Sequence, residues 1–164
     1  GEGGVEPTLF FGAAACDRCV CLHAMNRSRR HWRLQSAGVI DMRIASFRVF
    51  VRDLDRAATF FQSLLQLRIT ADGRAHGYIV FDGGAGLNLV VESVLTEAPT
   101  DEQVLVGRFT GVSFAVDDVA AEHARLVAAG VPFDGAPQAQ AWGGVLATFR
   151  DPAGNQFQLV QYPK

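Results

Sequence analysis

Two groups of side chains in this sequence have residue types and spacing that could do chemistry. The first is a Cys-x-x-Cys-x-Cys-x-His string, formed by Cys16, Cys19, Cys21 and His23. Thiolates and imidazole together bind soft metal ions. A structural zinc site, however, takes four ligands from two spaced pairs, and this run is short and has no second pair. We therefore expect no metal there, and no cofactor in the chain as a whole.

The second group comes from segments in which apolar and other residues alternate, the period of a half-buried strand. In the first such segment Phe47, Val49 and Val51 share one face, which we expect helices to cover. The opposite faces of the predicted strands carry the following residues: Ser46, Arg48, Phe50, Asn88, Glu92, Ser113 and Gln158. Such a surface is either a solvated sheet face or the wall of a ligand cleft. Because it holds few charges for a solvated face and includes apolar side chains, the cleft is favoured.

Each candidate ligand-binding residue has a definite chemical use. Phe50, Trp142 and Phe149 would supply apolar or stacking surface. Hydrogen bonds would come from Ser46, Asn88, Ser113 and Gln158. Arg48 and Glu92 would orient a ligand by charge, or would form only a structural ion pair. We assign no catalytic residue, except that Glu92 would be the base if the protein is an enzyme.

An internal repeat provides the elements that position these residues. The segments 47–54 and 112–119 each run from an alternating strand into an amphipathic helix, and Asp118 follows Asp53 by 65 residues. Both aspartates stand where a helix N-cap belongs, and Gly130 stands where the second helix should end. Strand-like runs follow each helix at 78–81 and 87–91, and then at 145–149 and 156–161. Each copy is therefore predicted to contain a strand, a helix and about three further strands.

These observations divide the chain. Residues 1–41 are expected to be an N-terminal extension, flexible or not native to the protein, and residues 42–164 one domain. Within the domain we expect module one at 44–92, a linker at 93–108 and module two at 109–162.

Composition limits the partners. The chain is 49% hydrophobic, and no apolar run in it is long enough to span a membrane, so we expect a cytoplasmic protein without a membrane partner. Residues 1–40 carry a net charge of +2 and residues 41–164 a net charge of −4. Nucleic-acid binding relies on basic patches, so an acidic core predicts no nucleic-acid partner.

Three parts of the sequence together resemble the vicinal oxygen chelate superfamily, which includes glyoxalase I, extradiol dioxygenases and bleomycin-resistance proteins. They are the two strand-to-helix junctions at 51–54 and 116–119, Trp142-Gly143, and the segment Phe149-Arg150-Asp151-Pro152-Ala153-Gly154-Asn155. The resemblance covers about residues 44–162. It implies an α+β fold of two βαβββ modules, which form a cup-shaped, mostly antiparallel eight-stranded sheet with helices outside. It also implies a homodimer, whose modules pair within one chain or swap between two.

The resemblance also identifies four positions at which enzymes of the superfamily hold a divalent metal. Here they carry Ser46, Asn88, Gly111 and Gln158, and none is His, Asp, Glu or Cys. Neutral amides and a hydroxyl offer little affinity for such ions. The sequence therefore predicts that the metal site is lost.

That loss leads to our preferred interpretation, a metal-independent protein that binds a small, drug-like, aromatic or cationic molecule and confers resistance by sequestration. The alternative is an enzyme, a lyase, isomerase or dioxygenase, with an atypical or absent metal site. A third interpretation is a structural or partner-binding module whose cup is filled by its own side chains. We expect His123 to lie on a solvated helix face, and residues 83–86 to form a hairpin turn.

Overall fold

The computed structural model describes residues 43–164, and it divides the chain into a unit at Gly1–Asp41 and a unit at Met42–Lys164. The expectations for residues 1–41, including the Cys–His string, lie outside the described residues. No helix in the described part of the chain is long and apolar enough to cross a membrane.

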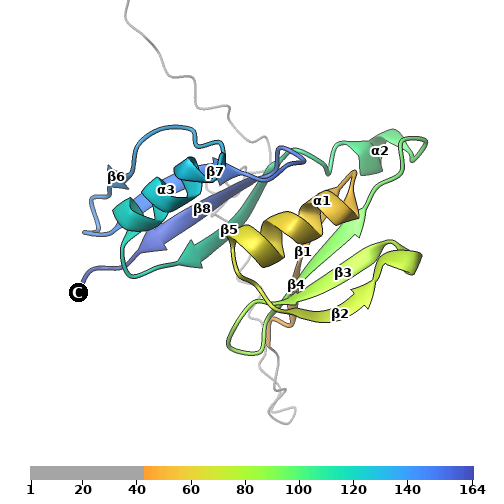
Figure 1. Cartoon of the computed structure of the whole chain (residues 1–164), viewed down its shortest axis with the longest axis horizontal. Helices are drawn as coiled ribbons and strands as arrows, with labels where there is room; N and C mark the ends of the chain where they lie inside the picture. The colour runs from red at the N-terminus through yellow and green to blue at the C-terminus, as the bar shows by residue number, and fades with distance from the viewer. Residues whose placement is uncertain (1–42) are drawn as a thin grey trace, which may run out of the picture. The chain divides into compact units, whose positions relative to one another are not determined.

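The two modules repeat the same order of elements (Figure 1). Module one contains β1 (Ser46–Val51), α1 (Leu54–Thr59), η1 (Phe60–Leu64), β2 (Ile69–Gly73), η2 (Arg74–His76), β3 (Tyr78–Asp82) and β4 (Asn88–Ser93). Module two contains β5 (Phe109–Ala115), α3 (Val119–Ala128), β6 (Gln138–Ala139), β7 (Val145–Arg150) and β8 (Gln156–Gln161). The βαβββ repeat predicted from the sequence is confirmed.

Each module forms its own four-stranded sheet. Sheet A has the order β1-β4-β3-β2 and sheet B the order β5-β8-β7-β6. In both sheets the first strand runs parallel to the last strand of the module, and the other neighbours are antiparallel. The α+β fold expected from the resemblance is confirmed, and its eight strands form two four-stranded mixed sheets. The edge strands β1 and β5 do not pair with each other.

Local sequence signals account for the beginnings and ends of the helices. The Asp53 carboxylate accepts a hydrogen bond from the Arg56 amide at 2.9 Å, and the Asp118 carboxylate accepts one from the Ala121 amide at 2.9 Å. Both residues are therefore N-caps, as predicted. Gly130 follows α3 with φ +84°, a left-handed conformation that costs a glycine little.

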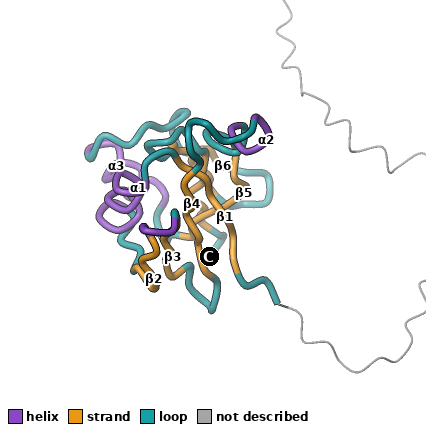
Figure 2. Tube along the Cα trace, turned by 90° about the vertical axis from the view of Figure 1, so that its right-hand side faces the viewer, coloured by secondary structure: helices purple, strands orange, loops and turns teal. Residues whose placement is uncertain are grey.

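The helix-covered faces of both sheets share one hydrophobic core. Val49, Val51 and Val91 of sheet A and Phe157 and Leu159 of sheet B are at most 1% exposed and belong to the same cluster. Figure 2 shows α1 and α3 on the same side of the strands. The sequence-based division into a core face and a polar face is correct for these residues.

The π-helical turn η1 joins the two modules. Its successive residues Phe60 and Phe61 are both buried. The Phe60 ring lies 6.3 Å from the Phe149 ring, and the Phe61 ring lies 5.8 Å from the Phe157 ring, so module one packs on the core face of sheet B.

Three local expectations need correction or refinement. The second helix was expected to be amphipathic, and it buries Val119 and Leu126, but its apolar residue Val127 is 48% exposed. His123 is half-buried rather than solvated, because its ring packs edge-on against Phe133 at 4.4 Å. The linker contains a short helix, α2 (Thr100–Gln103), in which the side-chain Nε2 of Gln103 donates to the carbonyls of Leu95, Thr96 and Ala98.

Candidate functional site

The polar face of sheet A brings together the predicted residues of module one. Ser46 pairs with Asn88, Arg48 with Val90, and Phe50 with Glu92 across β1 and β4. The Arg48 guanidinium lies 3.1 Å from the Glu92 carboxylate, so these two residues form an ion pair, with Arg48 mostly exposed and Glu92 half-buried. Phe50 is half-buried, and Arg108 lies over its ring at 6.0 Å from the centroid.

The polar face of sheet B holds the predicted residues of module two. Ser113 of β5 lies opposite Gln158 of β8, and the Ser113 hydroxyl donates to the Gln158 Oε1 at 3.4 Å. Across β7 and β8, Leu146 pairs with Val160, and Thr148 pairs with Gln158. The face therefore combines a hydroxyl, a carboxamide and apolar side chains.

Strand register corrects one equivalence drawn from the sequence. The four metal positions implied by the resemblance make Asn88 of module one equivalent to Gln158 of module two, and Ser46 equivalent to Gly111. In the structure Ser46 lies opposite Asn88, whereas Gln158 lies opposite Ser113. The pairing of β5 with β8 is irregular between Phe109 and Ser113, and Gly111 within that stretch has φ +74°. On the regular side of this bulge the two sheets agree: Gln158 lies opposite Ser113 as Val90 lies opposite Arg48, so Gln158 corresponds to Val90 and not to Asn88.

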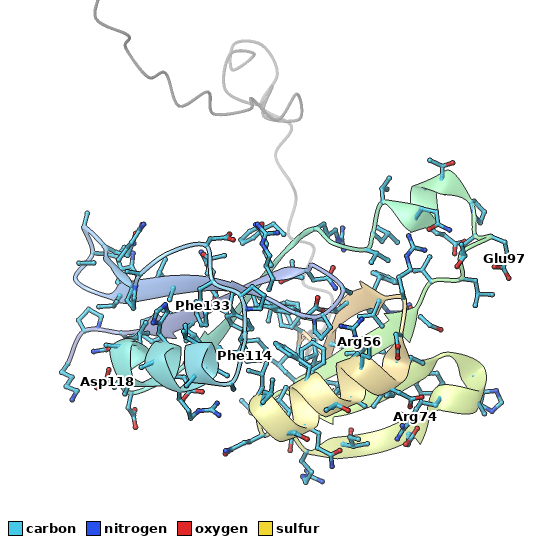
Figure 3. All side chains as sticks on the ribbon, turned by 45° about the horizontal axis from the view of Figure 1, so that its top comes forward. Arg56, Arg74, Glu97, Phe114, Asp118 and Phe133 are labelled. Carbon is cyan, nitrogen blue, oxygen red and sulfur yellow. The ribbon has the colours of Figure 1, made fainter. Side chains whose placement is uncertain are left out.

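Phe149 does not lie where the sequence analysis assigned it. Its side chain is 0% exposed and packs in the core, with ring contacts to Phe114, Phe133 and Phe157. Phe114 and Phe133 can be followed in Figure 3 beside α3. The expectation that Phe149 lines the cleft is therefore wrong, since β7 turns this position toward the helices.

Trp142 is a surface residue, 49% exposed, and its ring lies 6.0 Å from the ring of Tyr162. The indole covers Gly144, where any side chain would collide with it. Gly144 is two residues before Leu146, and Tyr162 is two residues after Val160. Because successive side chains alternate across a strand, the Trp142–Tyr162 pair continues the polar face of sheet B.

The Asp-Pro-x-Gly-Asn turn between β7 and β8 connects the two modules. Asn155 is fully buried, and its Nδ2 donates to the Phe50 carbonyl at 2.9 Å and to the Asp151 carboxylate at 2.9 Å. Its Oδ1 accepts a hydrogen bond from the Gly107 amide at 2.8 Å. One carboxamide thus fixes β1, the end of the linker and the turn relative to one another.

Two aspartates at equivalent turns have opposite electrostatic environments. Burial raises the pKa of the Asp151 carboxyl above its ordinary value, and hydrogen bonds from Asn155 and Ala153 offset this only in part. Asp82, at the turn between β3 and β4, is exposed to solvent. The amide of Gly84 and the guanidinium of Arg68 lower the pKa of the Asp82 carboxyl.

The four positions implied for a metal do not fit one. Ser46, Asn88 and Gln158 provide a hydroxyl and two neutral amides, and Gly111 has no side chain. The pair Ser46–Asn88 lies on sheet A and Gln158 on sheet B. Among residues 43–164, no group of three or more His, Cys, Asp or Glu side chains could hold a metal ion. A divalent ion needs anionic or imidazole donors, which this set does not offer.

Separate cavities lie over the two polar faces. One of about 740 Å³ at the end of sheet A is lined by Tyr78, Glu92 and the turn that contains His76 and Gly77. Another of about 260 Å³ lies over sheet B, with Gln138, Gln140, Leu146, Thr148, Asp134 and Gln158 among its lining residues. The predicted ligand-binding residues therefore fall into two groups within one chain.

Several site residues were missed by the sequence analysis. Tyr78, Thr148, Gln138 and Gln140 come from strands whose alternation is too short or too irregular to assign a face. The residues that pair with them across the sheet could have identified two of them, because Tyr78 lies opposite Glu92 and Thr148 lies opposite Gln158. Arg108 was assigned to the linker, and its position over Phe50 depends on tertiary contacts that no local pattern contains.

Comparison with known proteins supports the same architecture. Similar solved structures include TnmS3, an antibiotic binding protein from Streptomyces sp. CB03234, with 30% identity, coverage of 77% of this chain and 100% of that chain, and a TM-score of 0.61. A glyoxalase/bleomycin resistance protein from the same Streptomyces has 33% identity, coverage of 71% and 98%, and a TM-score of 0.54. A lactoylglutathione lyase from Agrobacterium tumefaciens has 22% identity, coverage of 73% and 92%, and a TM-score of 0.59, a likeness of fold alone.

No curated protein matches the chain. The family model of the Glyoxalase/Bleomycin resistance protein/Dioxygenase superfamily matches residues 43–159, which is nearly the whole described part of the chain. With its paired βαβββ modules and its Asp-Pro-x-Gly-Asn turn, this chain belongs to the Glyoxalase/Bleomycin resistance protein/Dioxygenase superfamily.

Proposed function

We propose that this protein binds a small molecule without a metal ion and without changing it chemically, and that it confers resistance to that molecule by sequestration. One observation carries the proposal: the polar faces of both sheets present hydrogen-bonding and aromatic side chains, while the superfamily's metal positions hold only Ser46, Asn88, Gly111 and Gln158. The similarity to an antibiotic binding protein supports the same class of function.

The residues proposed to contact the ligand are those of the two faces, with Phe149 left out because it is buried. On sheet A, Phe50 would contribute apolar surface, and the Arg48–Glu92 pair would orient a charged group. On sheet B, Ser113 and Gln158 would donate and accept hydrogen bonds. The exposure of several of these side chains argues against the third interpretation, a cup filled by its own residues.

We also propose a homodimer in which the faces of two chains complete the ligand site. The edge strands β1 and β5 expose Phe47 and Phe109, which are 42% and 55% accessible. Unpaired strand edges with large apolar side chains favour association with a second copy. Light scattering over a range of concentrations should give a dimer mass, and a constant monomer mass would contradict this. The cytoplasmic location remains a prediction, which cell fractionation would check.

The decisive experiment combines metal analysis with ligand recovery. The full chain with Cys16→Ser, Cys19→Ser and Cys21→Ser would be incubated with manganese, iron, nickel and zinc, and then desalted. We expect no metal to be retained, because the remaining donors are neutral. Equilibrium dialysis against a panel of antibiotics that includes metal-free bleomycin should show retention of at least one compound, recovered with unchanged mass.

An enzyme remains the alternative outcome of this experiment. Stoichiometric metal retention by the cysteine-free variant, or conversion of a retained compound, would favour it. In that case Glu92 is the candidate base, and Glu92→Gln should abolish turnover while leaving the compound bound. If no compound of the panel is retained, the sequestration proposal is contradicted.

A further inference from the structure

We propose that the polar face of sheet B recognises an uncharged, hydroxyl-bearing six-membered ring, as in a pyranose, either free or as the glycosyl part of a larger ligand. This inference rests on the proposed function, because it names the chemical class that one half of the ligand site selects. The carboxamides of β6 and β8 and the Trp142–Tyr162 pair carry it.

Strand register places these groups on one surface. Gln138 lies opposite Leu146 across β6 and β7, and Leu146 lies opposite Val160 across β7 and β8. The backbone N–H of Gln140 donates to the Gly144 carbonyl at 2.8 Å, which continues the β6–β7 hairpin by one more pair. Gln138 and Gln140 are two residues apart, so both side chains lie on the polar face of the sheet.

The carboxamides and the hydroxyl of this surface retain unused hydrogen-bonding capacity. The Gln140 Nε2 donates to the Gln138 carbonyl, and the Gln158 Oε1 accepts from the Ser113 hydroxyl. The Gln140 Oε1 is therefore still available as an acceptor, and the Gln158 Nε2 as a donor, for a ligand. Within residues 43–164, the side chains of Gln138 and Thr148 have no protein hydrogen-bond partner. A carboxamide offers donors and an acceptor side by side, which matches neighbouring hydroxyl groups that also do both.

The aromatic pair supplies the other element of ring recognition. Trp142 and Tyr162 lie at the end of the same face, and both are about half exposed or more. Their broad, rigid surfaces can pack against the C–H face of a saturated ring, while their polar tips stay in water. The Leu146–Val160 pair lies between them and the Thr148–Gln158 pair, so apolar contact gives way to hydrogen bonding along the strands.

Charge on this face selects against ions. Arg150 and Asp134 line the edge of the surface, but they bind each other, with the Arg150 Nε 3.0 Å from the Asp134 Oδ1. Gln156 donates a further hydrogen bond to the same carboxylate at 3.1 Å. Moving a cation or an anion from water to this surface would cost hydration that neutral amides do not return, whereas neutral hydroxyls exchange partners at little cost.

The size of the cavity agrees with a single ring. Its volume of about 260 Å³ lies just below the range of pockets that enclose whole drug-sized ligands, roughly 300–1,000 Å³. The surface is thus matched to one portion of a ligand, while sheet A contacts the rest.

The experiment uses the full chain with Trp32→Phe, so that Trp142 is its one remaining tryptophan. The probes are methyl pyranosides of glucose, galactose and mannose, with cyclohexylmethanol, tetramethylammonium and benzoate as competitors of other classes. Tryptophan fluorescence and saturation-transfer NMR would be followed up to high millimolar probe. We expect at least one pyranoside to bind and to change Trp142 emission, with no comparable effect from the three competitors.

Variants on the two faces sharpen the test. Gln158→Leu or Gln138→Leu should weaken pyranoside binding about fivefold to tenfold, the factor that corresponds to losing one net hydrogen bond. Gln62→Leu, which removes an exposed carboxamide of η1 outside both polar faces, is the matched control and should leave the affinity unchanged. Circular dichroism of each variant would confirm that it is folded.

Three results would overturn the inference: no pyranoside binds; cyclohexylmethanol or an ion binds better than every pyranoside; or Gln62→Leu weakens binding as much as Gln158→Leu does. Antibiotic retention with any of these results would leave the proposed function standing and remove only the assignment of a ring class to sheet B. Pyranoside binding without antibiotic retention would contradict the proposed function and leave the ring class assigned to sheet B standing.

Discussion

The two modules have nearly the same core and very different polar faces. Phe81 and Phe149 occupy corresponding places in the third strand of their sheets, opposite Leu89 and Phe157, and both are 0% exposed. On the polar face, the row Phe50–Glu92–Tyr78 of sheet A corresponds to Ala115–Val160–Leu146 of sheet B. The next row, Arg48–Val90–Val80, corresponds to Ser113–Gln158–Thr148.

The difference shows which positions packing constrains. A core residue must fill a fixed volume against several neighbours, so both modules retain large apolar side chains there. A residue on the polar face contacts solvent or a ligand, and its chemistry can change without loss of the fold. On the same backbone plan, the polar face of sheet A therefore carries the Arg48–Glu92 ion pair between its first two strands. The corresponding positions of sheet B are neutral, and its own ion pair, Arg150–Asp134, lies at the edge of the face. The predictions below test how far the likeness of the cores and the difference of the faces extend.

The largest effect is expected in the shared core. Phe149→Ala and Phe81→Ala should each lower the free energy of unfolding by about 3–5 kcal/mol, because each leaves a cavity among packed rings. Urea denaturation followed by circular dichroism measures this. If Phe149→Ala cost less than about 1 kcal/mol while ligand retention fell, the assignment of Phe149 to the core would be wrong.

A smaller loss is expected from Asn155→Ala, about 2–3 kcal/mol, because it leaves the Phe50 carbonyl and the Gly107 amide without their partner. Module one has no counterpart of this buried carboxamide. The control is Asn88→Ala, whose side chain is exposed and should change stability by less than about 0.5 kcal/mol. Equal losses from both variants would remove the special role of Asn155.

The two turn aspartates should respond to pH in opposite ways. Asp82 has a lowered pKa when folded, so its contribution to stability is present above its ordinary pKa of 3.8 and is lost as pH falls through the lowered value. Asp151 has a raised pKa when folded, so the unfolded chain releases its proton first, and stability falls as pH rises from 3.8 through the raised value.

Paired variants would measure this contrast. As the pH is lowered through the acidic range, the stability of Asp82→Asn should improve relative to the unmodified chain. As the pH is raised through the same range, the stability of Asp151→Asn should improve relative to the unmodified chain. Parallel urea titrations across the acidic range give both differences. Slopes of the same sign for the two variants would contradict the assigned environments.

The smallest effect concerns the polar faces themselves. Arg48→Ser gives module one the residue that module two has at Ser113, and it should cost no more than about 1 kcal/mol of stability, because the Arg48 side chain is mostly exposed. Ligand retention is the informative readout. If stability falls and retention is unchanged, the Arg48–Glu92 pair has only a structural role.

The sequence alone predicted the fold, and it predicted about half of the residues on each sheet face. Alternation in β1, β4 and β8 is regular, so it assigned Val49, Leu89 and Phe157 to the core correctly. The segment 145–149 is apolar at every position except Thr148, so alternation could not show which way Phe149 points. Only the pairing of β7 with β8 decides that.

Other features depended on contacts between distant parts of the chain. The bulge at Gly111 interrupts the regular pairing of β5 with β8 between Phe109 and Ser113, and a glycine in an apolar segment does not reveal a bulge by itself. The Asp-Pro-x-Gly-Asn turn was recognised as a motif, but the partners of Asn155 are 48 and 105 residues away. Local periodicity contains no information at those separations.

The hydrogen bond from Asn155 to Phe50 has a consequence for synthesis on the ribosome. Because β1 and residue 155 are 105 positions apart, the amino-terminal module leaves the exit tunnel long before this contact can form. Until then the core face of module one also lacks its partner in sheet B, because the Phe61 ring packs against Phe157 of the last strand. Translation pauses before the last strand would prolong the exposure of this apolar face to other nascent chains, whereas rapid completion of the carboxyl terminus would bury it.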